Sequence, residues 1–449
     1  MAKQLFGTDG IRGIPGQFPL DDATLFRTGR SLGLYLRATG ASNSKQAVLI
    51  GMDTRESGPH IAGEIAAGLA AAGVSAASAG VITTPGVACL VRQKKFSAGA
   101  VISASHNPYH DNGVKLFAAT GMKFPDEVEE ELEAEITGNH VKAAEALWLT
   151  TDPSLDAAYL EFLRGCVLSG AKFAGMKIVL DCANGAAFRL GPDLFRSLGA
   201  NVIAIHDAPD GRNINTNCGS LHPEELQKLV VQEGAALGVA FDGDADRALF
   251  VSASGKLIDG DGTLLAMARY LKSTHKLKCG RVVGTTMANL GLERALGTEG
   301  VQLVRTQVGD RYVLEEMIRG GCNLGGEQSG HIIFLDDATT GDGLLTAIKV
   351  ASLVALRGPL DQLISGLKIY PQTIRNVKVR SKPPIETLKE VSRTLGDATR
   401  ALGDRGRIVL RYSGTEPKLR VMVEAERPEE VERWASALVT AVESDLGSS

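Results

Sequence analysis

The chain has 449 residues, of which 44% are hydrophobic, so it is long enough to form several separate cores. Its formal net charge of −4 gives no overall basic signal for nucleic acid or for an anionic membrane surface. The sequence contains neither the apolar run of a signal peptide nor the ~20 apolar residues of a membrane span. The six cysteines are scattered without a C-x-x-C pair, which is typical of reduced thiols. We therefore expect a cytoplasmic protein with no nucleic-acid and no membrane partner.

Strand–loop–helix units recur along the chain. In each unit an apolar, β-branched run leads into a loop containing Gly, Asp or Asn, and a helical pattern follows. The sequence predicts three such units. Their strands lie over 48–52, 178–180 and 282–284, and the helices that follow them lie over 61–72, 188–198 and 290–296, respectively. This weak internal repeat predicts three related α/β domains.

The chain changes character after Tyr370-Pro371. The last part is predicted to contain strands over 375–379, 408–412 and 419–425 and helices over 384–402 and 428–444. This pattern indicates a smaller α+β domain. Together with breaks near residues 152 and 254, it divides the chain into four domains, at 1–152, 153–254, 255–370 and 371–449.

A single serine, Ser105, lies in the run Ser103-Ala104-Ser105-His106-Asn107-Pro108, just after a predicted strand over 98–103. Ligand sites of α/β sheets gather at strand ends, and a serine hydroxyl can carry a phosphoryl group. A loop serine that makes a local turn bond is the alternative for this run taken alone. A hydrolase triad is disfavoured, because no G-x-S-x-G surrounds Ser105 and adjacent Ser and His side chains rarely face each other.

Three carboxylates alternate in the loop Asp242-Gly243-Asp244-Ala245-Asp246-Arg247. Alternation brings them to one side of an extended loop, where a hard cation such as Mg²⁺ takes oxygen ligands and shares them with a phosphate. An EF-hand is excluded, because its glycine position holds Arg247 and its twelfth position holds Ala253. A solvated acidic turn is the alternative, but the apolar run over 237–241 indicates that a buried strand leads into the loop.

The loop over 325–331 places Glu327 and Ser329 two residues apart between glycines. Both side chains can therefore point the same way and bind vicinal hydroxyls, although Gly-Gly-Glu is also common in turns.

A fourth loop, over 411–417, is rich in phosphate-binding side chains. Arg411, Ser413, Thr415 and the nearby Arg420 can surround one phosphate with guanidinium, hydroxyl and backbone N–H donors. A hairpin with surface charges is the alternative for this loop.

As a set and in this order, the four loops resemble those of the α-D-phosphohexomutase superfamily. The run Phe6-Gly7-Thr8-Asp9-Gly10-Ile11-Arg12-Gly13 is similar to its N-terminal motif, as is Asn213-Ile214-Asn215 followed by Cys218-Gly219-Ser220. Gln328 stands where the phosphomannomutase/phosphoglucomutase branch usually has Met, and it resembles the bacterial phosphoglucosamine mutases. The runs 286–292 and 308–313 resemble the same branch, except that Ala288 replaces a frequent Ser. The resemblance covers essentially the whole chain.

This resemblance implies three related α/β domains with mixed sheets and a C-terminal α+β domain around a central cleft. It implies an isomerase that interconverts glucosamine 6-phosphate and glucosamine 1-phosphate, on the route to UDP-N-acetylglucosamine and cell-wall precursors. Ser105 would be a phosphoserine, and one Mg²⁺ per subunit would be bound by it together with Asp242, Asp244 and Asp246. Glucosamine 1,6-bisphosphate or glucose 1,6-bisphosphate would serve as intermediate or activator, and the chain could form a homodimer.

The resemblance also assigns roles to further residues. Glu327 and Ser329 would contact sugar O3 and O4, and the untransferred phosphate would be held by Arg411, Ser413, Gly414, Thr415 and Arg420. Lys115 is a candidate for general acid/base work or charge stabilisation, with a surface lysine as its alternative. Further catalytic candidates are His106, His331, Arg12 and Arg247.

Two alternative functions stay open at this point. One is a phosphomannomutase/phosphoglucomutase with relaxed sugar choice. The other is a silent module that binds metal and sugar phosphate in a regulatory role. A hinge near Tyr370-Pro371 is a further hypothesis.

Overall fold

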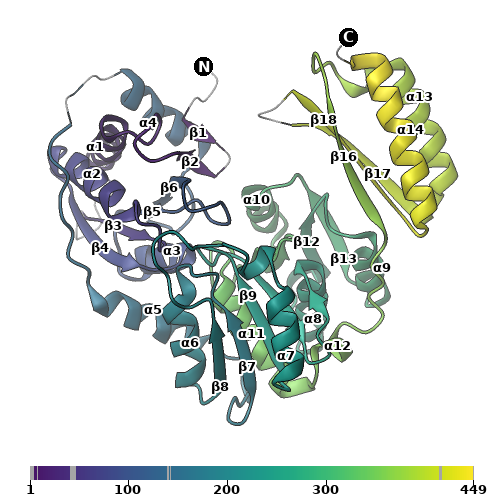
Figure 1. The fold of residues 1–449 in the computed structure, drawn as a ribbon, viewed down its shortest axis with the longest axis horizontal. Coiled ribbons are helices and arrows are strands. Elements are labelled where there is room, and N and C mark those ends of the chain that lie inside the picture. The colour runs from purple at the N-terminus through teal and green to yellow at the C-terminus, as the bar shows by residue number, and fades with distance from the viewer. Residues whose placement is uncertain are drawn as a thin grey trace. The chain divides into compact units, whose positions relative to one another are not determined.

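The computed structural model describes residues 5–7, 9–40, 47–138, 141, 143–413 and 417–447 (Figure 1). The chain divides into two compact units, which we call the first unit (residues 1–285 and 306–365) and the second unit (residues 286–305 and 366–449). No helix in the described ranges is both long and apolar enough to cross a membrane.

The elements of the first unit, in chain order, are β1 (Phe6–Gly7), β2 (Gly10–Gly13), α1 (Asp22–Ala38), β3 (Ala47–Met52), α2 (Gly58–Ala71), β4 (Ser75–Val81), α3 (Thr84–Gln93), β5 (Ala98–Ile102), β6 (Asn112–Ala118), α4 (Asp126–Gly138), α5 (Pro153–Gly165), β7 (Lys177–Asp181), α6 (Ala187–Ser197), β8 (Asn201–Ile205), α7 (Glu224–Gln232), β9 (Leu237–Phe241), β10 (Ala248–Ser252), β11 (Leu257–Ile258), α8 (Gly260–Ser273), β12 (Arg281–Thr285), α10 (Asp310–Gly320), β14 (Leu324–Gly326), β15 (Ile332–Phe334), α11 (Gly343–Arg357) and α12 (Leu360–Leu363).

Three mixed sheets share one strand pattern. In the first sheet β3 runs parallel to β5, and β5 pairs antiparallel with β6. In the second sheet β7 runs parallel to β9, which pairs antiparallel with β10. In the third, β12 runs parallel to β14, and β14 pairs antiparallel with β15. The internal repeat predicted from the sequence is thus a repeat of topology, and the predicted mixed α/β sheets are confirmed.

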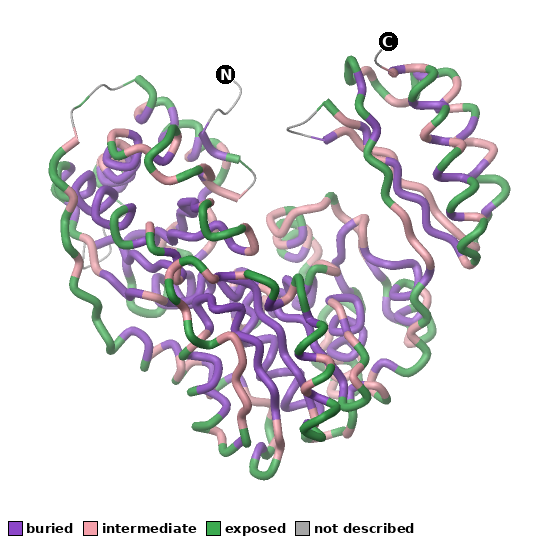
Figure 2. Tube along the Cα trace, viewed as in Figure 1, coloured by how far each residue is buried: buried purple, intermediate pink, exposed green. Residues whose placement is uncertain are grey.

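The central strands β7, β9 and β10 of the second sheet are buried on both faces (Figure 2). Because successive side chains of a strand point to opposite faces, Val179 and Ala240 pack toward α7. Their neighbours Leu180 and Phe241 face the opposite way, where Gly191 of α6 lies close to both. Burial on both faces explains why these strands read as continuous apolar runs in the sequence.

The second unit is an antiparallel sheet covered on one face by helices. Its elements are α9 (Leu290–Thr298), β16 (Gln372–Lys378), α13 (Lys389–Leu402), β17 (Gly406–Tyr412), β18 (Lys418–Ala425) and α14 (Pro428–Leu446), and β13 (Gln302–Thr306) begins there. The sheet order is β16-β18-β17. Leu419, Val421 and Val423 of β18 pack into a core with α13 and α14. Alternation therefore sends Arg420 to the face that these helices leave open.

One predicted helix boundary is wrong. The helix expected from Pro384 begins at Lys389, and residues 385–387 form a single 3₁₀ turn instead. Pro384 adopts an extended conformation with ψ 131°. Leu388 is also extended, with ψ 114°, and separates this turn from the helix.

Candidate active site

The same loop of each mixed sheet carries a predicted group of site residues. Ser105 lies between β5 and β6, the aspartates lie between β9 and β10, and Glu327 lies between β14 and β15. The Ser105 hydroxyl donates a hydrogen bond to Oδ2 of Asp242 at 2.7 Å. The backbone N–H of Ala248 donates to the carbonyl oxygen of Gly330 at 3.1 Å. Three loops that are far apart in the sequence are thus in contact.

The backbone of Ser105 is held in an uncommon conformation. Its φ of 52° lies in the left-handed region, which non-glycine residues rarely adopt outside over-determined sites. Its N–H donates to Oγ of Ser103 at 2.9 Å, and its carbonyl oxygen accepts from Nδ2 of Asn215 at 2.9 Å. Arg55 donates to the same carbonyl at 3.2 Å. These bonds fix the direction of the hydroxyl.

The neighbouring histidine does face the serine, contrary to the expectation from the sequence. Nδ1 of His106 lies 3.4 Å from Oγ of Ser105. The left-handed turn at Ser105 brings the two adjacent side chains together. Burial, and then the charges of Arg247 and Arg12, lower the pKa of His106, so the imidazole is neutral at pH 7.

Asp242, Asp244 and Asp246 form a buried carboxylate cluster, with one oxygen of each within 4.8 Å of the others. This burial contradicts the alternative of a solvated acidic turn. Burial, and then the charges of Asp246 and Asp244, hold the pKa of Asp242 well above its usual range. Oδ1 of Asp244 and Oδ1 of Asp246 are buried without a hydrogen-bond partner among the described residues. Unsatisfied carboxylate oxygens in this number fit a hard divalent cation, so the cluster could bind a metal ion.

Lys115 of β6 is almost completely buried, at 2% exposure, which contradicts the alternative of a surface lysine. Its Nζ lies 2.9 Å from Asp244 and 3.1 Å from Asp9. Burial alone would lower the pKa of this amine, but Asp244, Asp9 and Asp246 raise it well above the usual value. Lys115 therefore carries a positive charge that offsets part of the charge of the aspartate cluster.

A second lysine extends this network to the third sheet. Nζ of Lys123 lies 2.6 Å from Asp9 and 2.7 Å from Asp310, at the start of α10. His331, with Nε2 3.9 Å from Asp310, is buried and neither ring nitrogen has a hydrogen-bond partner. Arg12 forms an ion pair with Asp9. Arg12 and His331 thus lie at two ends of one charged network.

Arg247 contacts two aspartates of its own loop. Its backbone N–H donates to Oδ1 of Asp242 at 3.2 Å, and its Nε lies 3.7 Å from Oδ1 of Asp246. Burial would lower the pKa of Arg247, but Asp246 and Asp242 raise it, so it remains charged.

The predicted sugar-binding loop offers one exposed and one partly buried side chain. Oε1 of Glu327 accepts a hydrogen bond from the backbone N–H of Gly309 at 3.1 Å, and Ser329 is exposed. Gln328 donates to Asp259 at 3.1 Å. The amide of Gln328 thus binds the residue that caps α8.

The second unit contains a separate cationic hollow of about 310 Å³ on the open face of its sheet, lined by Met287, Ile374, Asn376, Val409, Arg411, Arg420 and Met422. Arg411 and Arg420 are direct partners across β17 and β18. Burial and the charge of Arg420 lower the pKa of Arg411. Ser413 is buried, whereas the predicted phosphate-binding residues Gly414 and Thr415 lie outside the described residues.

Comparison with known families matches four consecutive parts of the chain. They correspond to the phosphoglucomutase/phosphomannomutase alpha/beta/alpha domains I, II and III, at residues 3–142, 157–255 and 259–370, and to the C-terminal domain, at residues 375–441. The chain belongs to the phosphoglucomutase/phosphomannomutase family. Within this family, it is 50% identical to the phosphoglucosamine mutase of Solibacter usitatus, over 100% of both chains.

Solved structures of this family share the fold. A phosphoglucomutase/phosphomannomutase family protein from Burkholderia thailandensis has a TM-score of 0.79 at 24% identity and covers 98% of this chain and 97% of its own. The N-acetylphosphoglucosamine mutase of Aspergillus fumigatus, in complex with GlcNAc-6P and magnesium, has a TM-score of 0.64 at 19% identity, with 98% and 96% coverage.

Several residues around Ser105 were not predicted to belong to the site. Thr84 donates to Asp244 at 2.6 Å, and Asp53 pairs with Arg55 beneath the serine loop. Asp9 lies within the N-terminal motif, and Asp310 lies within the run 308–313. Both runs resemble family motifs, so these two residues could have been found from the sequence. Lys123 lay in no motif.

Proposed function

We propose that this chain interconverts glucosamine 6-phosphate and glucosamine 1-phosphate through a phosphoserine at Ser105. The observation that carries the proposal is the Ser105 hydroxyl, 2.7 Å from Asp242 and held over a buried cluster of three aspartates. The named activity of the relative that is 50% identical over the full length supports glucosamine phosphate as the substrate.

The reaction consists of two phosphoryl transfers. In the first, the bond between phosphorus and Oγ of Ser105 breaks, and a bond forms between phosphorus and O1 of glucosamine 6-phosphate. The proton of the O1 hydroxyl passes to a base. The resulting 1,6-bisphosphate turns over in the site. The bond between phosphorus and O6 then breaks, the 6-phosphoryl group returns to Oγ of Ser105, and O6 takes the proton back from the base. The product is glucosamine 1-phosphate, and the phosphoserine is regenerated.

Asp242, Asp244 and Asp246 would hold one Mg²⁺ together with the phosphoserine, in line with the unsatisfied oxygens of Asp244 and Asp246. When bound, the cation offsets negative charge on the transferring group. Magnesium also appears with the Aspergillus fumigatus relative. Lys115 lies against the same aspartates and would stabilise the transferring charge, because its pKa is raised.

His106 is the candidate that best fits a proton acceptor. Its neutral imidazole, with Nδ1 3.4 Å from Oγ of Ser105, can hold a proton beside the reacting oxygen. His331, Arg12 and Arg247 would contribute to the charged surroundings of the transfer.

The remaining residues would bind the parts of the substrate that do not react. Glu327 and Ser329 would contact the O3 and O4 hydroxyls. Their hydroxyl contacts suit both orientations of the bisphosphate. The untransferred phosphate would be held by Arg411, Ser413, Gly414, Thr415 and Arg420, and glucosamine or glucose 1,6-bisphosphate would activate the enzyme. We infer four domains, at 1–152, 153–254, 255–370 and 371–449, and a cytoplasmic protein that can form a homodimer.

The test is product formation from glucosamine 6-phosphate with Mg²⁺ and catalytic bisphosphate, with glucose and mannose 1-phosphates in parallel. Ser105→Ala is the control. We expect a strong preference for the glucosamine substrate, which disappears in the variant. A preference for glucose or mannose phosphates would assign the chain to the phosphomannomutase/phosphoglucomutase activity. No turnover on any sugar after Ser105 has been phosphorylated would contradict the mutase proposal.

A further inference from the structure

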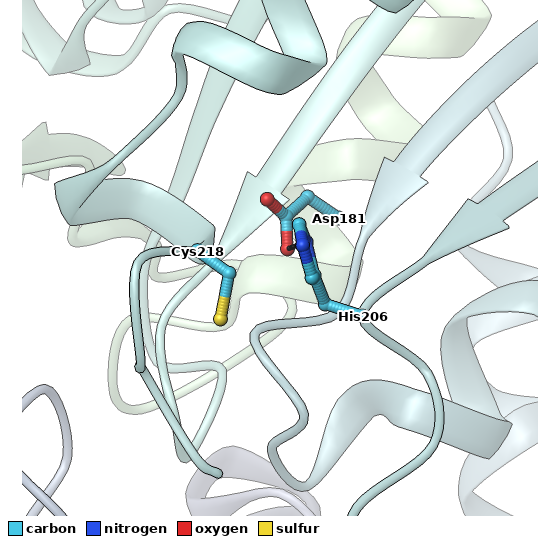
Figure 3. A group of neighbouring side chains, drawn as sticks. All are labelled: Asp181, His206 and Cys218. Carbon is cyan, nitrogen blue, oxygen red and sulfur yellow. Dashed lines mark ion pairs between the residues drawn. The ribbon is translucent and has the colours of Figure 1, made fainter.

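A second cluster of metal-binding side chains lies in the first unit, outside the site proposed above. Asp181 ends β7, His206 follows β8, and Cys218 precedes a short 3₁₀ turn at Gly219–Leu221. Figure 3 shows the three side chains coming from separate segments of the chain. One ligand atom of each lies within 4.8 Å of the others, and Asp181 and Cys218 are buried. The side-chain types are a carboxylate, an imidazole and a thiol.

The repeat of the fold shows that Asp181 lacks the partner that its counterpart has. Asp53 follows β3 as Asp181 ends β7, and in both loops one carboxylate oxygen accepts from the N–H two residues later. In the first sheet that later residue is Arg55, whose guanidinium neutralises Asp53. In the second sheet it is Ala183, which brings no charge. The positive charge beside the buried carboxylate of Asp181 must therefore come from His206, when its ring is protonated, or from a bound metal ion, while the N–H of Gly219 donates to Oδ2 at 2.8 Å.

His206 is oriented as a metal-binding histidine would be. Nδ1 is buried and pairs with Oδ1 of Asp181 at 3.1 Å, without a well-aligned hydrogen bond to any described residue. The other ring nitrogen, Nε2, lies 3.5 Å from the carboxylate of Glu225. Histidines that bind a metal through one nitrogen commonly direct the other toward a carboxylate, which fixes the ring. Nδ1 of His206 and Oδ1 of Asp181, which pair when the ring is protonated, would therefore become metal ligands when a metal ion takes the place of that proton.

We propose that Asp181, His206 and Cys218 bind a zinc ion. Thiolate, imidazole and carboxylate are the ligand set that zinc takes in proteins, whereas Mg²⁺ prefers oxygen ligands alone. The thiol of Cys218 loses its proton to solvent when the sulfur binds the metal, so binding weakens at low pH. A water molecule completes the coordination. The site is chemically distinct from the aspartate cluster and takes a different ion.

The zinc ion would stabilise the segment that supports the reactive serine. Residues 206–218 begin and end at metal ligands, and this segment includes Asn215. Nδ2 of Asn215 donates to the carbonyl oxygens of Ser105, at 2.9 Å, and of Asn107, at 3.0 Å. His206 and Asn215 both have positive φ, at 47° and 60°, so the segment holds an unfavourable backbone conformation that a metal would help to maintain.

The experiment is titration of the chelator-treated full chain with Co²⁺, a spectroscopic substitute for zinc, in excess Mg²⁺. A bound thiolate gives a sulfur-to-cobalt charge-transfer band in the near ultraviolet, which oxygen ligands alone do not give. We expect the band to saturate at one Co²⁺ per chain and to disappear on addition of Zn²⁺. Glu225→Gln should weaken Co²⁺ binding about tenfold.

Two variants and one control decide the outcome. His206→Asn should abolish the band while keeping the fold, because asparagine tolerates positive φ. Cys218→Ser should also abolish it. Cys279→Ser is the control and should retain the band, because Cys279 and Cys322, whose sulfurs lie 2.9 Å apart, are the competing thiol source. Absence of the band in the wild type, or its persistence in Cys218→Ser, would overturn the proposal. Hydrogen exchange over 206–219 should slow with Zn²⁺ in the wild type but not in His206→Asn.

Discussion

Two regions of this molecule carry unbalanced charge, and the two charges are of opposite sign. In the first unit, Asp242, Asp244 and Asp246 are buried together, and Lys115 offsets only part of their charge. In the second unit, Arg411 and Arg420 face each other across two strands. The ion pairs found among the described residues give neither arginine a carboxylate. A cation would complete the first region and an anion the second, as the proposed metal-assisted phosphoryl transfer with a separate phosphate clamp requires.

The difference also shows what the fold supplies and what the residues supply. The topology places one loop in the same position of each mixed sheet, so Ser105, the aspartates and Glu327 occupy equivalent places. The chemistry of each loop depends only on the few residues it carries. Removal of a negative charge from the aspartate cluster should therefore weaken the binding of a cation. Removal of a positive charge from the pair of Arg411 and Arg420 should weaken the binding of an anion.

Removal of one cluster carboxylate should have the largest effect. We expect Asp246→Asn to lower kcat by about 10³-fold, because the cation contributes several kcal/mol to stabilising the transferring charge. The measurement is kcat as a function of Mg²⁺ concentration. Asp193→Asn, an exposed aspartate, is the matched control and should match the wild type. An Asp246→Asn enzyme with the wild-type kcat and Mg²⁺ dependence would show that the cluster does not bind the catalytic metal.

Removal of the compensating lysine should reduce stability. We expect Lys115→Met to lower the free energy of unfolding by about 3–5 kcal/mol, because Asp9 and Asp244 lose their buried partner. Mg²⁺ should restore part of this loss by taking up the charge. Denaturant unfolding with and without Mg²⁺ measures both effects. Lys177→Met, which breaks the more exposed pair with Glu233, should cost below about 1 kcal/mol. An equally small loss in Lys115→Met would contradict the compensation.

Asp342 is a buried carboxylate without a lysine, and it should respond to pH instead. Burial raises its pKa to about 6, although Leu345 and Tyr159 donate to it. Because the folded state binds the proton more tightly than the unfolded state, this stabilisation is complete below about pH 4 and is lost as the pH rises to 6. The shift of about two units corresponds to about 3 kcal/mol.

Asp342→Asn keeps the helix cap and removes the titration. The free energy of unfolding of the variant minus that of the wild type should therefore rise between pH 4 and pH 6 and stay level above pH 7. Chemical unfolding across this range measures the difference. A difference that does not change with pH would show that Asp342 is ionised without cost.

The smallest effect is expected in the second unit. Arg420→Ala should lower kcat/KM by about 10–100-fold, since a hydrogen bond to a charged phosphate contributes about 1.5–3 kcal/mol. Its stability should stay level or rise slightly, because two like charges across strands repel each other. Arg375→Ala in the same sheet, paired with Glu432 at the surface, is the control. Loss of stability in Arg420→Ala together with unchanged kcat/KM would contradict the phosphate role.

The sequence predicted most elements and the positions of the three loops between paired strands of the mixed sheets, because both depend on local patterns. Continuous apolar runs marked the buried strands, and alternating Asp residues after one of them indicated a metal cluster. The start of the helix at Lys389 was misplaced, because helical periodicity does not reveal that Pro384 and Leu388 are extended.

Contacts between distant residues could not be predicted in the same way. Lys123 and Asp310 are 187 residues apart, and no pattern around Lys123 indicates its partner. The depth of burial of Lys115 depends on Asp9 and on the aspartate loop of the second sheet, which both lie against it, so a surface position stayed open as an alternative from its local sequence. The approach of His106 to Ser105 depends on one left-handed residue, and serine gives no local signal for that conformation.

The most direct test of the account is transfer of a labelled phosphoryl group from Ser105. The full chain is loaded with radiolabelled phosphate at Ser105, freed of excess label, and mixed with unlabelled glucosamine 6-phosphate and Mg²⁺. The account predicts that the label moves to the sugar phosphate within a single turnover, and that Ser105→Ala takes up no label. Label that stays on the protein, or that is released only as inorganic phosphate, would contradict the phosphoserine route.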